Sequence, residues 1–204
     1  MKNNIKKQKE IEELLIKVGI EIAKKGEGAL FVICNNCKYT KLLKQKIQPF
    51  SIFEKGAIKT LLSIGMIDGA VIIDSKGVVQ EYGAMIKSKK VFHGFGTRHA
   101  AAYNASLDKN AVAILVSQEE RKVKIFKNGK VVIQFDALEK NIEKKVSEAS
   151  HVLESVGFGT FSAIGVAALA PTLGIAIVPG IILFGAPYYI FKRIKERTEK
   201  DSKK

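Results

Sequence analysis

Hydrophobic residues in the first 25 positions recur at the spacing of one helix face. The positions at this spacing are Ile11, Leu14, Leu15, Val18 and Ile22, and Lys and Glu residues separate them. Glycines at positions 26 and 28 follow, which favours a helix end. The pattern predicts an N-terminal amphipathic helix within residues 1–27 that packs on the rest of the protein. A helix on a membrane surface is the alternative, and its acidic residues disfavour it because they dilute the basic face.

Short apolar runs alternate with helical segments and turn signals between residues 28 and 154. Strands are predicted over residues 29–34, 71–73, 78–86, 111–117, 123–126 and 130–135. Helices are predicted over residues 51–64, 97–106 and 137–156, the first with Ser51 and Glu54 as a capping box. Residues 74–77 and 128–129 have the composition of hairpin turns. This alternation predicts an α/β domain over residues 28–154, with a mixed β-sheet flanked by helices.

The region after this domain has a different composition. No residue from Ser155 to Phe191 is charged, and a helix needs about 20 apolar residues to cross a bilayer. Residues 155–191 are therefore predicted to form a hydrophobic membrane segment, either a hairpin hinged near Pro171 or a single span. A buried helical pair is the alternative without a membrane. Residues 192–204 form a basic tail, which favours the cytoplasmic side.

The net charge favours anionic partners. The 204-residue chain has 34 Lys and Arg residues against 20 Asp and Glu residues, a formal net charge of +14. Nucleotide, nucleic acid and anionic lipid all fit such a charge. Nucleic-acid binding depends on the charge alone here, because aromatic residues are not interleaved with the basic ones and no recognition motif is visible. We therefore expect no nucleic-acid partner.

Two cysteines, Cys34 and Cys37, lie three positions apart. A closed zinc site needs four ligands, and there is no second pair of cysteines, while the three histidines lie far away in the sequence. We expect two reduced thiols at the end of a strand. The small number of cysteines and the charged N-terminus without an apolar leader favour the cytosolic side of a membrane.

Two short motifs carry candidate chemistry. In the first, glycines at 94 and 96 precede Thr97, Arg98 and His99. A helix beginning near Thr97 would point its backbone N–H groups at the turn, and Arg98 would add a planar fork for phosphate oxygens. In the second, Asp68 precedes an apolar strand, where a carboxylate can bind a divalent metal or accept a proton from a hydroxyl. The alternatives are a capped surface loop for the first motif and a local turn residue for Asp68.

Together these motifs resemble the diadenylate cyclase family. The resemblance rests on Asp68-Gly69-Ala70, on Gly96-Thr97-Arg98-His99 and on the strand that ends at Ser117, and it covers roughly residues 29–135. It implies a diadenylate cyclase-like fold and a nucleotidyltransferase that condenses two ATP into cyclic di-AMP with release of two pyrophosphates. Family members usually carry a second Arg after the His, where this chain has Ala100. This departure keeps a second hypothesis open, a non-catalytic membrane-attached nucleotide-binding module.

The resemblance also implies roles for single residues. Asp68 would bind a divalent metal, Mg²⁺ or Mn²⁺, and help activate the attacking 3′-hydroxyl. The residues expected to bind ATP are Gly69, Ala70, Thr97, Arg98, His99 and Ser117. Glu119 is a further candidate metal ligand, with a solvated turn residue as the alternative. Met66 and Ile67 either join the core or pack on adenine.

The implied reaction is symmetric, because the 3′-hydroxyl of each ATP attacks the α-phosphate of the other. Two domains must therefore meet face to face, at least transiently, as a homodimer. An ATP-using domain and the basic tail both belong in the cytoplasm, which favours the hairpin form of residues 155–191. The expected partners are thus ATP, a second copy of the chain and membrane lipid, with the catalytic domain on the cytoplasmic face of the cell membrane.

Overall fold

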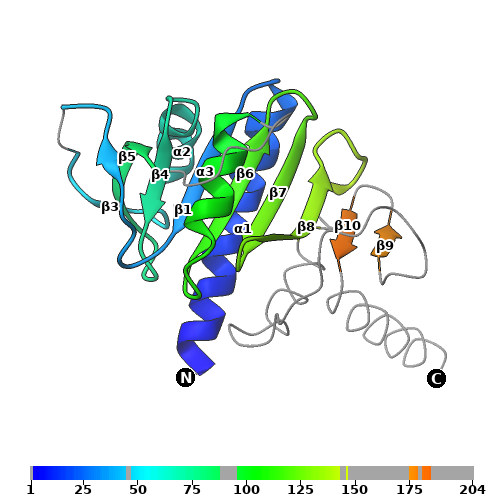
Figure 1. Cartoon of the computed structure of the whole chain (residues 1–204), viewed down its shortest axis with the longest axis horizontal. Helices are drawn as coiled ribbons and strands as arrows, with labels where there is room; N and C mark the ends of the chain where they lie inside the picture. The colour runs from blue at the N-terminus through cyan, green and yellow to red at the C-terminus, as the bar shows by residue number, and fades with distance from the viewer. Residues whose placement is uncertain are drawn as a thin grey trace.

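Among the residues that the structure describes, the largest feature is a ten-stranded sheet (Figure 1). The computed structural model describes residues 2–44, 47–87, 96–142, 146, 175–178 and 181–184. The strands are β1 (Ala29–Ile33), β2 (Thr40–Lys41), β3 (Phe50–Ser51), β4 (Ala70–Ile73), β5 (Val78–Met85), β6 (Val112–Ser117), β7 (Lys122–Lys127), β8 (Lys130–Asp136), β9 (Ile175–Val178) and β10 (Ile181–Phe184). Their order is β2-β5-β4-β1-β6-β7-β8-β10-β9, and β3 also pairs with β5. β1 and β4 run parallel and the other pairs antiparallel, so the predicted mixed sheet is confirmed.

Helices cover both faces of this sheet. α1 (Lys2–Lys24) and α2 (Ala57–Gly65) pack on one face, and α3 (Thr97–Ala105) packs on the other (Figure 1). Successive residues of a strand point to opposite faces. In β1, Phe31 and Ile33 join the core under α1, whereas Leu30 and Val32 join the core under α3. Strands buried on both faces explain why β1 and β6 read as continuous apolar runs.

The N-terminal helix is part of the core. Ile11, Leu15 and Ile22 of α1 are fully buried against the sheet, as the helical spacing predicts. Glu12 is buried as well, and its carboxylate accepts a bond from Gln8 and pairs with Lys127 of β7 at 3.2 Å. The prediction of a helix packed on the domain is therefore confirmed, rather than a helix on a membrane surface.

Both predicted hairpin turns form. Asp74 Oδ1 accepts hydrogen bonds from the backbone N–H groups of Lys76 at 2.8 Å and Val78 at 2.9 Å, which closes the turn between β4 and β5. Asn128 and Gly129 have φ values of 51° and 68°, which suits the tight turn between β7 and β8.

The predicted start of α2 is wrong by six residues. Ser51 pairs with Val78 in the sheet as the end of β3. Glu54 does accept a hydrogen bond from the Ser51 N–H at 3.0 Å, so the capping-box contact forms, but it forms in a turn before the helix. Gly56 then precedes the helix with φ 89°, a left-handed conformation that interrupts any helix from 51 to 57.

The prediction of reduced thiols is also wrong. Cys34 directly follows β1, as expected, but a disulfide joins it to Cys37. The turn between them brings the two Cα atoms to 5.9 Å, within the range that a disulfide spans.

The described parts of the predicted helical membrane segment are strands. Residues 175–178 and 181–184 form β9 and β10, and β10 extends the sheet beside β8. Isoleucine, valine and phenylalanine make up six of these eight residues, and all three favour strands. Most of residues 137–204, including most of the predicted helix 137–156, lies outside the described residues. Among the helices that the structure describes, none is both long and apolar enough to cross a bilayer.

Candidate active site

Asp68 and Arg98, from two motifs 30 positions apart, meet at one edge of the sheet. Parallel strands β1 and β4 both begin at this edge, and antiparallel β6 ends there. Asp68 lies two residues before β4, and Arg98 lies in the first turn of α3. Their side chains form an ion pair, with Arg98 Nη2 3.6 Å from Asp68 Oδ1. The structure thus brings together the two motifs that the sequence singled out.

The guanidinium of Arg98 is held in place and has spare hydrogen-bonding capacity. Its side chain is 30% exposed, against 88% for Asp68. Arg98 Nε is buried and has no hydrogen-bond partner among the described residues. A buried N–H without a partner is costly. The partly exposed guanidinium group of Arg98 next to Asp68 can therefore donate hydrogen bonds to an oxyanion ligand.

Gly28 makes room for that guanidinium. A Cβ atom at Gly28 would lie 3.0 Å from Arg98 Nη1, 3.4 Å from the Val116 carbonyl oxygen and 3.5 Å from Gln118 Cβ. The guanidinium therefore passes over the start of β1, next to the end of β6. The sequence predicts Gly28 only as part of a helix end, because the contact with Arg98 depends on a fold that brings residues 28 and 98 together.

We predict that Gly28→Ala weakens ligand binding without unfolding the protein. The added methyl group would displace the guanidinium by a few tenths of an ångström, because the Val116 carbonyl oxygen and the Gln118 Cβ atom confine the methyl group on the other side. Loss of one charge-assisted hydrogen bond corresponds to about tenfold in the dissociation constant, and calorimetry with ATP, the ligand that the resemblance implies, measures it. If Gly28 acts through Arg98, the effect should vanish in an Arg98→Met background. A full effect in that background would contradict this role.

His99 lies beside a buried lysine. His99 Nε2 is 3.3 Å from the Nζ atom of Lys124, and the same Nζ atom pairs with Glu120 at 2.7 Å. Burial and the charge of Lys124 lower the pKa of His99, while Glu120 and Glu119 oppose the shift without cancelling it. Burial acts to raise the pKa of Glu120, but its hydrogen bond and charge interaction with Lys124 outweigh burial and lower it. The imidazole is therefore neutral near pH 7.

The other predicted site residues lie around this edge in different settings. Thr97 is exposed at the start of α3, which has Gly96 as its N-cap and no side-chain cap. Ser117 is buried at the end of β6, and its Oγ accepts the backbone N–H of Glu120 at 3.3 Å. Glu119 is exposed in the turn that follows. Ala100, at the position of the expected arginine, is 8% exposed and offers no side-chain donor.

Gly69 has a packing reason to be glycine. Its φ is +96°, and a Cβ there would lie 2.7 Å from the carbonyl carbon of Gly83 and 2.9 Å from the amide nitrogen of Ala84. Its N–H donates to Asp68 Oδ1 at 3.0 Å, which orients the carboxylate. Ala70 begins β4, is 1% exposed and pairs with Ala84. At the Asp-Gly-Ala motif, the backbone before β4 thus lies very close to the backbone of β5, and this close contact holds Asp68 at the edge.

We predict that Gly69→Ala destabilises the fold by about 3 kcal/mol, through left-handed strain and a clash with backbone that cannot turn aside. The melting temperature should fall by roughly 6–12 °C. Gly56→Ala is the matched control, because Gly56 has φ +89° with nothing within 4 Å of an added Cβ. It should cost only the strain, about 1–2 kcal/mol. Equal losses in the two variants would show that the approach to Gly83 is not tight.

The donor set suits a hard divalent cation. The described residues contain no group of three His, Cys, Asp or Glu side chains arranged to hold a metal. Mg²⁺ commonly uses one or two carboxylates together with substrate phosphates, and Asp68 and Glu119 are exposed carboxylates at the same edge.

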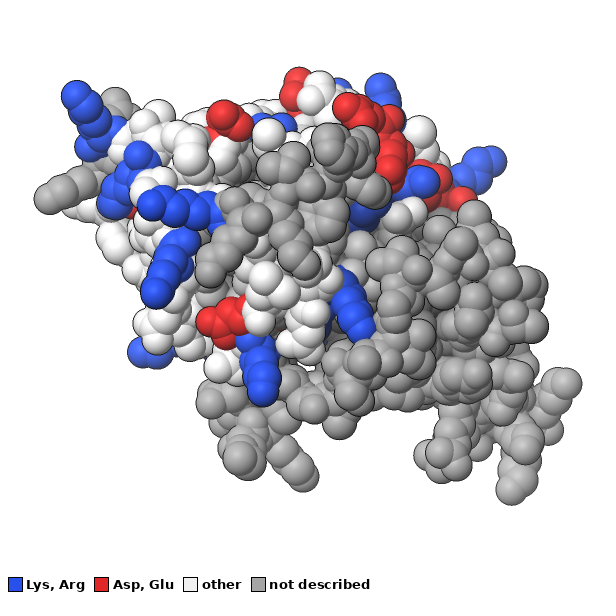
Figure 2. Space-filling view, viewed as in Figure 1, with Lys and Arg blue, Asp and Glu red and all other residues white. Residues whose placement is uncertain are grey.

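Figure 2 shows acidic side chains gathered over the upper ends of β6 and β7, while basic side chains line the side that carries β3 and β5.

Two apolar side chains next to Asp68 remain on the surface. Met66 and Ile67 are each 37% exposed, in the connection from α2 to β4. Of the two interpretations of these residues, burial in the core is therefore wrong. Their exposure beside Asp68 leaves an apolar surface available to a ligand.

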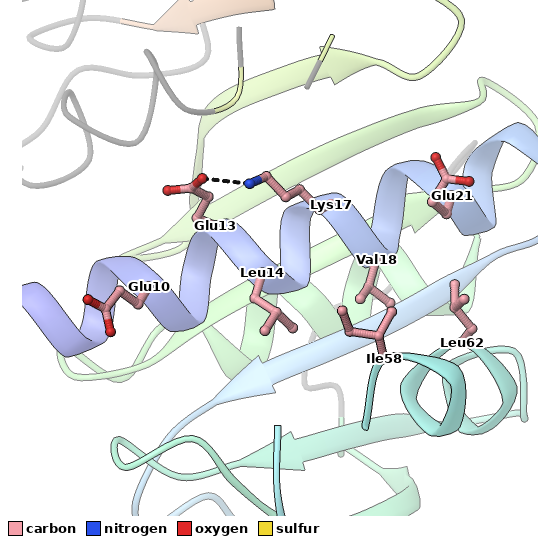
Figure 3. A pocket seen from close by; sticks show the side chains of 8 residues that line it. All are labelled: Glu10, Glu13, Leu14, Lys17, Val18, Glu21, Ile58 and Leu62. Atoms are coloured by element: carbon pink, nitrogen blue, oxygen red, sulfur yellow. Dashed lines mark hydrogen bonds and ion pairs between the residues drawn. The ribbon is translucent and has the colours of Figure 1, made fainter. Parts of the chain in front are cut away.

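An apolar groove on the face of the sheet that α1 and α2 cover is separate from this site. It has a volume of about 400 Å³ and lies between α1 and α2, where Leu14, Val18, Ile58 and Leu62 line it (Figure 3). Glu13 and Lys17 pair on its α1 wall at 2.8 Å. None of the predicted site residues lines it, and the chemistry described above belongs to the edge near Asp68.

Comparison with known proteins agrees with the motifs. The chain matches two proteins named diadenylate cyclase: one from Methanocaldococcus jannaschii, 34% identical over 144 residues, and one from Haloferax volcanii, 30% identical over 139 residues. These matches cover 64% and 60% of this chain but only 47% and 51% of the relatives, so the chain spans about half the length of the curated relatives it matches. A crystal structure of DacA from Staphylococcus aureus aligns with a TM-score of 0.45 and 21% identity, over 70% of this chain and 97% of that one.

The family match covers the elements that build the site. Residues 19–131 match the DAC family, described as the DisA bacterial checkpoint controller nucleotide-binding domain. This range runs from the end of α1 into β8 and includes Gly28, Asp68, Arg98 and Lys124. The chain belongs to the DAC family of DisA-type nucleotide-binding domains.

Proposed function

We propose that this protein is a diadenylate cyclase that condenses two ATP molecules into cyclic di-AMP and releases two pyrophosphates. The observation that supports this most directly is the meeting of Asp68 and Arg98, 3.6 Å apart, at the open edge of the sheet in a chain of this family. Two relatives named diadenylate cyclase, with 34% and 30% identity, support the same assignment.

In the proposed reaction the 3′-hydroxyl oxygen of one ATP attacks the α-phosphorus of the other. A bond from the ribose oxygen to phosphorus forms, the bond from the α-phosphorus to the bridging oxygen breaks, and pyrophosphate leaves. The carboxylate of Asp68 suits acceptance of the hydroxyl proton, because its side chain is 88% exposed and therefore accessible to a ligand. A second, equivalent step closes the ring.

Charge neutralisation would come from Arg98 and the start of α3. The transition state of nucleotidyl transfer spreads negative charge over phosphate oxygens, and catalysis depends mainly on positioned donors. Arg98 would supply its planar guanidinium fork, whose Nε–H has no partner among the described residues. The backbone N–H groups at the start of α3, where Thr97 lies, would add further donors. His99 and Ser117 are assigned to the same phosphates.

A divalent metal is part of the proposal. Asp68, with Glu119 as a further ligand, would hold Mg²⁺ or Mn²⁺ together with phosphate oxygens. When bound, the ion would neutralise phosphate charge and lower the pKa of the attacking hydroxyl. Met66 and Ile67 offer apolar contact to adenine.

The reaction demands two copies of the site. Each domain would hold one ATP, and the ribose of each nucleotide would have to reach the α-phosphate of the other. We therefore propose a face-to-face homodimer, at least during turnover, with the Asp68 edges opposed. Attachment to lipid through residues 155–191 stays a prediction, and β9 and β10 take eight of those residues into the sheet.

Incubation of the full chain with ATP and either Mn²⁺ or Mg²⁺, followed by chromatography, tests the activity. Cyclic di-AMP and pyrophosphate in a 1:2 ratio are expected. ATP binding without product would instead support the non-catalytic nucleotide-binding module, for which Ala100 in place of the usual arginine is the specific reason. Absence of both binding and product would overturn the nucleotide assignment.

A further inference from the structure

Cys34 and Cys37 form a disulfide that the proposed function does not use. Cys34 directly follows β1 and Cys37 lies in the connection to β2, so the bond joins residues only three positions apart. A disulfide constrains the unfolded chain less when its loop is short, and this one bridges no two elements of the fold. It is therefore poorly suited to stabilise the sheet. Its Cys-x-x-Cys spacing is instead that of redox-active pairs.

The two cysteines differ in their access to solvent. Cys34 is 5% exposed and belongs to the core under α3, whereas Cys37 is half-buried at the border of that core. Both line a cavity of about 620 Å³. Asn35 and Asn36 line the same cavity and are exposed, so it lies at the surface. A thiol that enters this cavity therefore reaches Cys37 more readily than Cys34.

The disulfide also shortens the tether between β1 and β2. Cys34 lies at the edge where the parallel strands β1 and β4 end, whereas β2 pairs with the end of β5, near the edge where β4 begins. Six residues, 34–39, connect β1 to β2, but with the disulfide closed only residues 38 and 39 separate Cys37 from β2. β2 itself is two residues long. Such a short strand depends on how closely the chain before it is held.

The chain after β2 lies over the backbone next to Asp68. The Leu42 N–H donates to the Gly83 carbonyl oxygen at 3.0 Å, and a Cβ atom at Gly83 would lie 3.0 Å from Leu43 Cδ1. Gly83 is also the residue that Gly69 approaches, since a Cβ at Gly69 would lie 2.7 Å from the Gly83 carbonyl carbon. The disulfide is thus connected through β2 to the backbone that positions Asp68.

We propose that Cys34 and Cys37 are a thiol–disulfide exchange site for dithiol reductants, and that the closed disulfide holds β2 against β5 beside the Asp68 edge. Reduction lengthens the tether and lets β2 separate from β5 more often. The oxidation state of the pair thereby controls the order of a strand next to the site. This inference goes beyond the proposed function and does not rest on it, because the exchange needs neither ATP nor turnover.

The exchange proceeds through a mixed disulfide. A thiolate of the dithiol attacks Cys37 Sγ, the bond between the two protein sulfur atoms breaks, and Cys34 Sγ leaves as a thiolate. The second thiolate of the dithiol then displaces Cys37 Sγ and closes the disulfide of the donor. Two electrons pass from the dithiol to the protein, and each protein sulfur takes one of the two protons that the dithiol gives up.

Reduction of the native protein tests the exchange. The full chain at pH 7 is treated with dithiothreitol, then with oxidised dithiothreitol, and is alkylated at each stage with N-ethylmaleimide for mass spectrometry. We expect both cysteines to be alkylated after reduction and neither after reoxidation, with an unchanged circular dichroism spectrum. A disulfide that opens only in denaturant would overturn the proposal. So would a chain that unfolds on reduction, because the bond would then be structural.

Single-cysteine variants test which sulfur is attacked. Cys34→Ser leaves the half-buried Cys37, and Cys37→Ser leaves the nearly buried Cys34. The Cys37 thiol should react with N-ethylmaleimide several-fold faster than the Cys34 thiol, because reactivity follows exposure. Equal rates would contradict the assignment of Cys37 as the attacked sulfur.

Hydrogen–deuterium exchange of backbone amides tests the hold on β2. Exchange at the Leu42 N–H follows the equilibrium for local opening of its bond to Gly83. The loop-closure term for six connecting residues in place of two predicts about fivefold faster exchange after reduction. The Ala137 N–H, which donates to the Arg121 carbonyl oxygen at 3.1 Å beside β7 and β8, is the internal control. It should exchange equally fast in both states.

The double variant Cys34→Ala/Cys37→Ala controls for the reagent. Its Leu42 N–H should exchange at the fast rate with or without dithiothreitol, because the variant has no disulfide to break. If reduction frees both thiols of the wild type but leaves exchange at Leu42 unchanged, the proposal fails. An equal rise at Ala137 would also contradict it, since reduction would then loosen the whole fold. None of these measurements uses ATP, so a chain that makes no cyclic di-AMP would overturn the proposed function alone.

Discussion

Asp68→Asn should reduce cyclic di-AMP formation by about 10²–10⁴-fold, the range for loss of a general base, and leave the fold unchanged. The side chain is 88% exposed, so the substitution disturbs no core packing. Its one hydrogen bond given by the structure, from the Gly69 N–H to Oδ1, can be accepted equally by an asparagine oxygen. The amide cannot take a proton or serve as an anionic metal ligand. Initial rates of product formation at saturating ATP and metal measure the effect.

Asp108→Asn is the matched control for this variant. Asp108 is exposed after the C-terminal end of α3, and its Oδ1 accepts the Asn110 N–H at 3.0 Å, a local contact of the same kind. It should retain wild-type activity. Asp68→Asn should melt within about 1–2 °C of wild type, because surface substitutions seldom change stability by more than about 0.5 kcal/mol. Retained activity in Asp68→Asn would remove the carboxylate from the mechanism.

The secondary structure near the site followed from periodicity and turn chemistry. The run from Val112 to Ser117 is buried on both faces, so every position is apolar until the strand reaches the edge. Asn128-Gly129 tolerates positive φ at both positions, so the hairpin between β7 and β8 was predictable from two residues. Such signals are local, so they do not depend on how the rest of the chain folds.

The pairing of Gly28 with Arg98 could not be predicted in this way. Gly28 has no unusual φ, and its reason for being glycine is a side chain 70 positions later. Lys124 alternates with the apolar residues Val123 and Ile125. This alternation predicts that Lys124 lies on the exposed, polar face of a half-buried strand. Its burial comes from α3, which covers that face. Both residues depend on which elements the fold places together.

Local rules also failed where a tertiary contact competed with them. Ser51 Oγ accepts the Phe53 N–H, as expected of a capping residue. However, Ser51 pairs with Val78 as part of β3, and α2 begins only at Ala57. The uncharged run from Ser155 to Phe191 is apolar enough for a membrane, but composition alone does not distinguish a lipid-facing helix from a strand that pairs with β8.

Arg98→Lys should weaken ATP binding about tenfold and lower turnover by about 10²–10³-fold, the range for a donor that stabilises charge in the transition state. Lysine keeps the charge but removes the planar fork and the buried Nε–H that has no partner in the described structure. The single ammonium cannot pair with Asp68 and also reach phosphate oxygens from the position over Gly28. Binding by calorimetry and initial rates of cyclic di-AMP formation separate the two effects.

Arg121→Lys controls for the exchange itself. Arg121 donates to the Lys24 carbonyl oxygen at 3.4 Å and packs near Gly26, so it also carries a guanidinium against a glycine, but at the end of α1. That variant should bind and turn over ATP as the wild type does. If Arg98→Lys also did so, charge alone would suffice at this position, and the planar guanidinium would have no part in holding the phosphates. A loss confined to Arg98→Lys, together with unchanged adenosine binding, would place the guanidinium on the phosphates, because adenosine lacks the groups that the fork is built to hold.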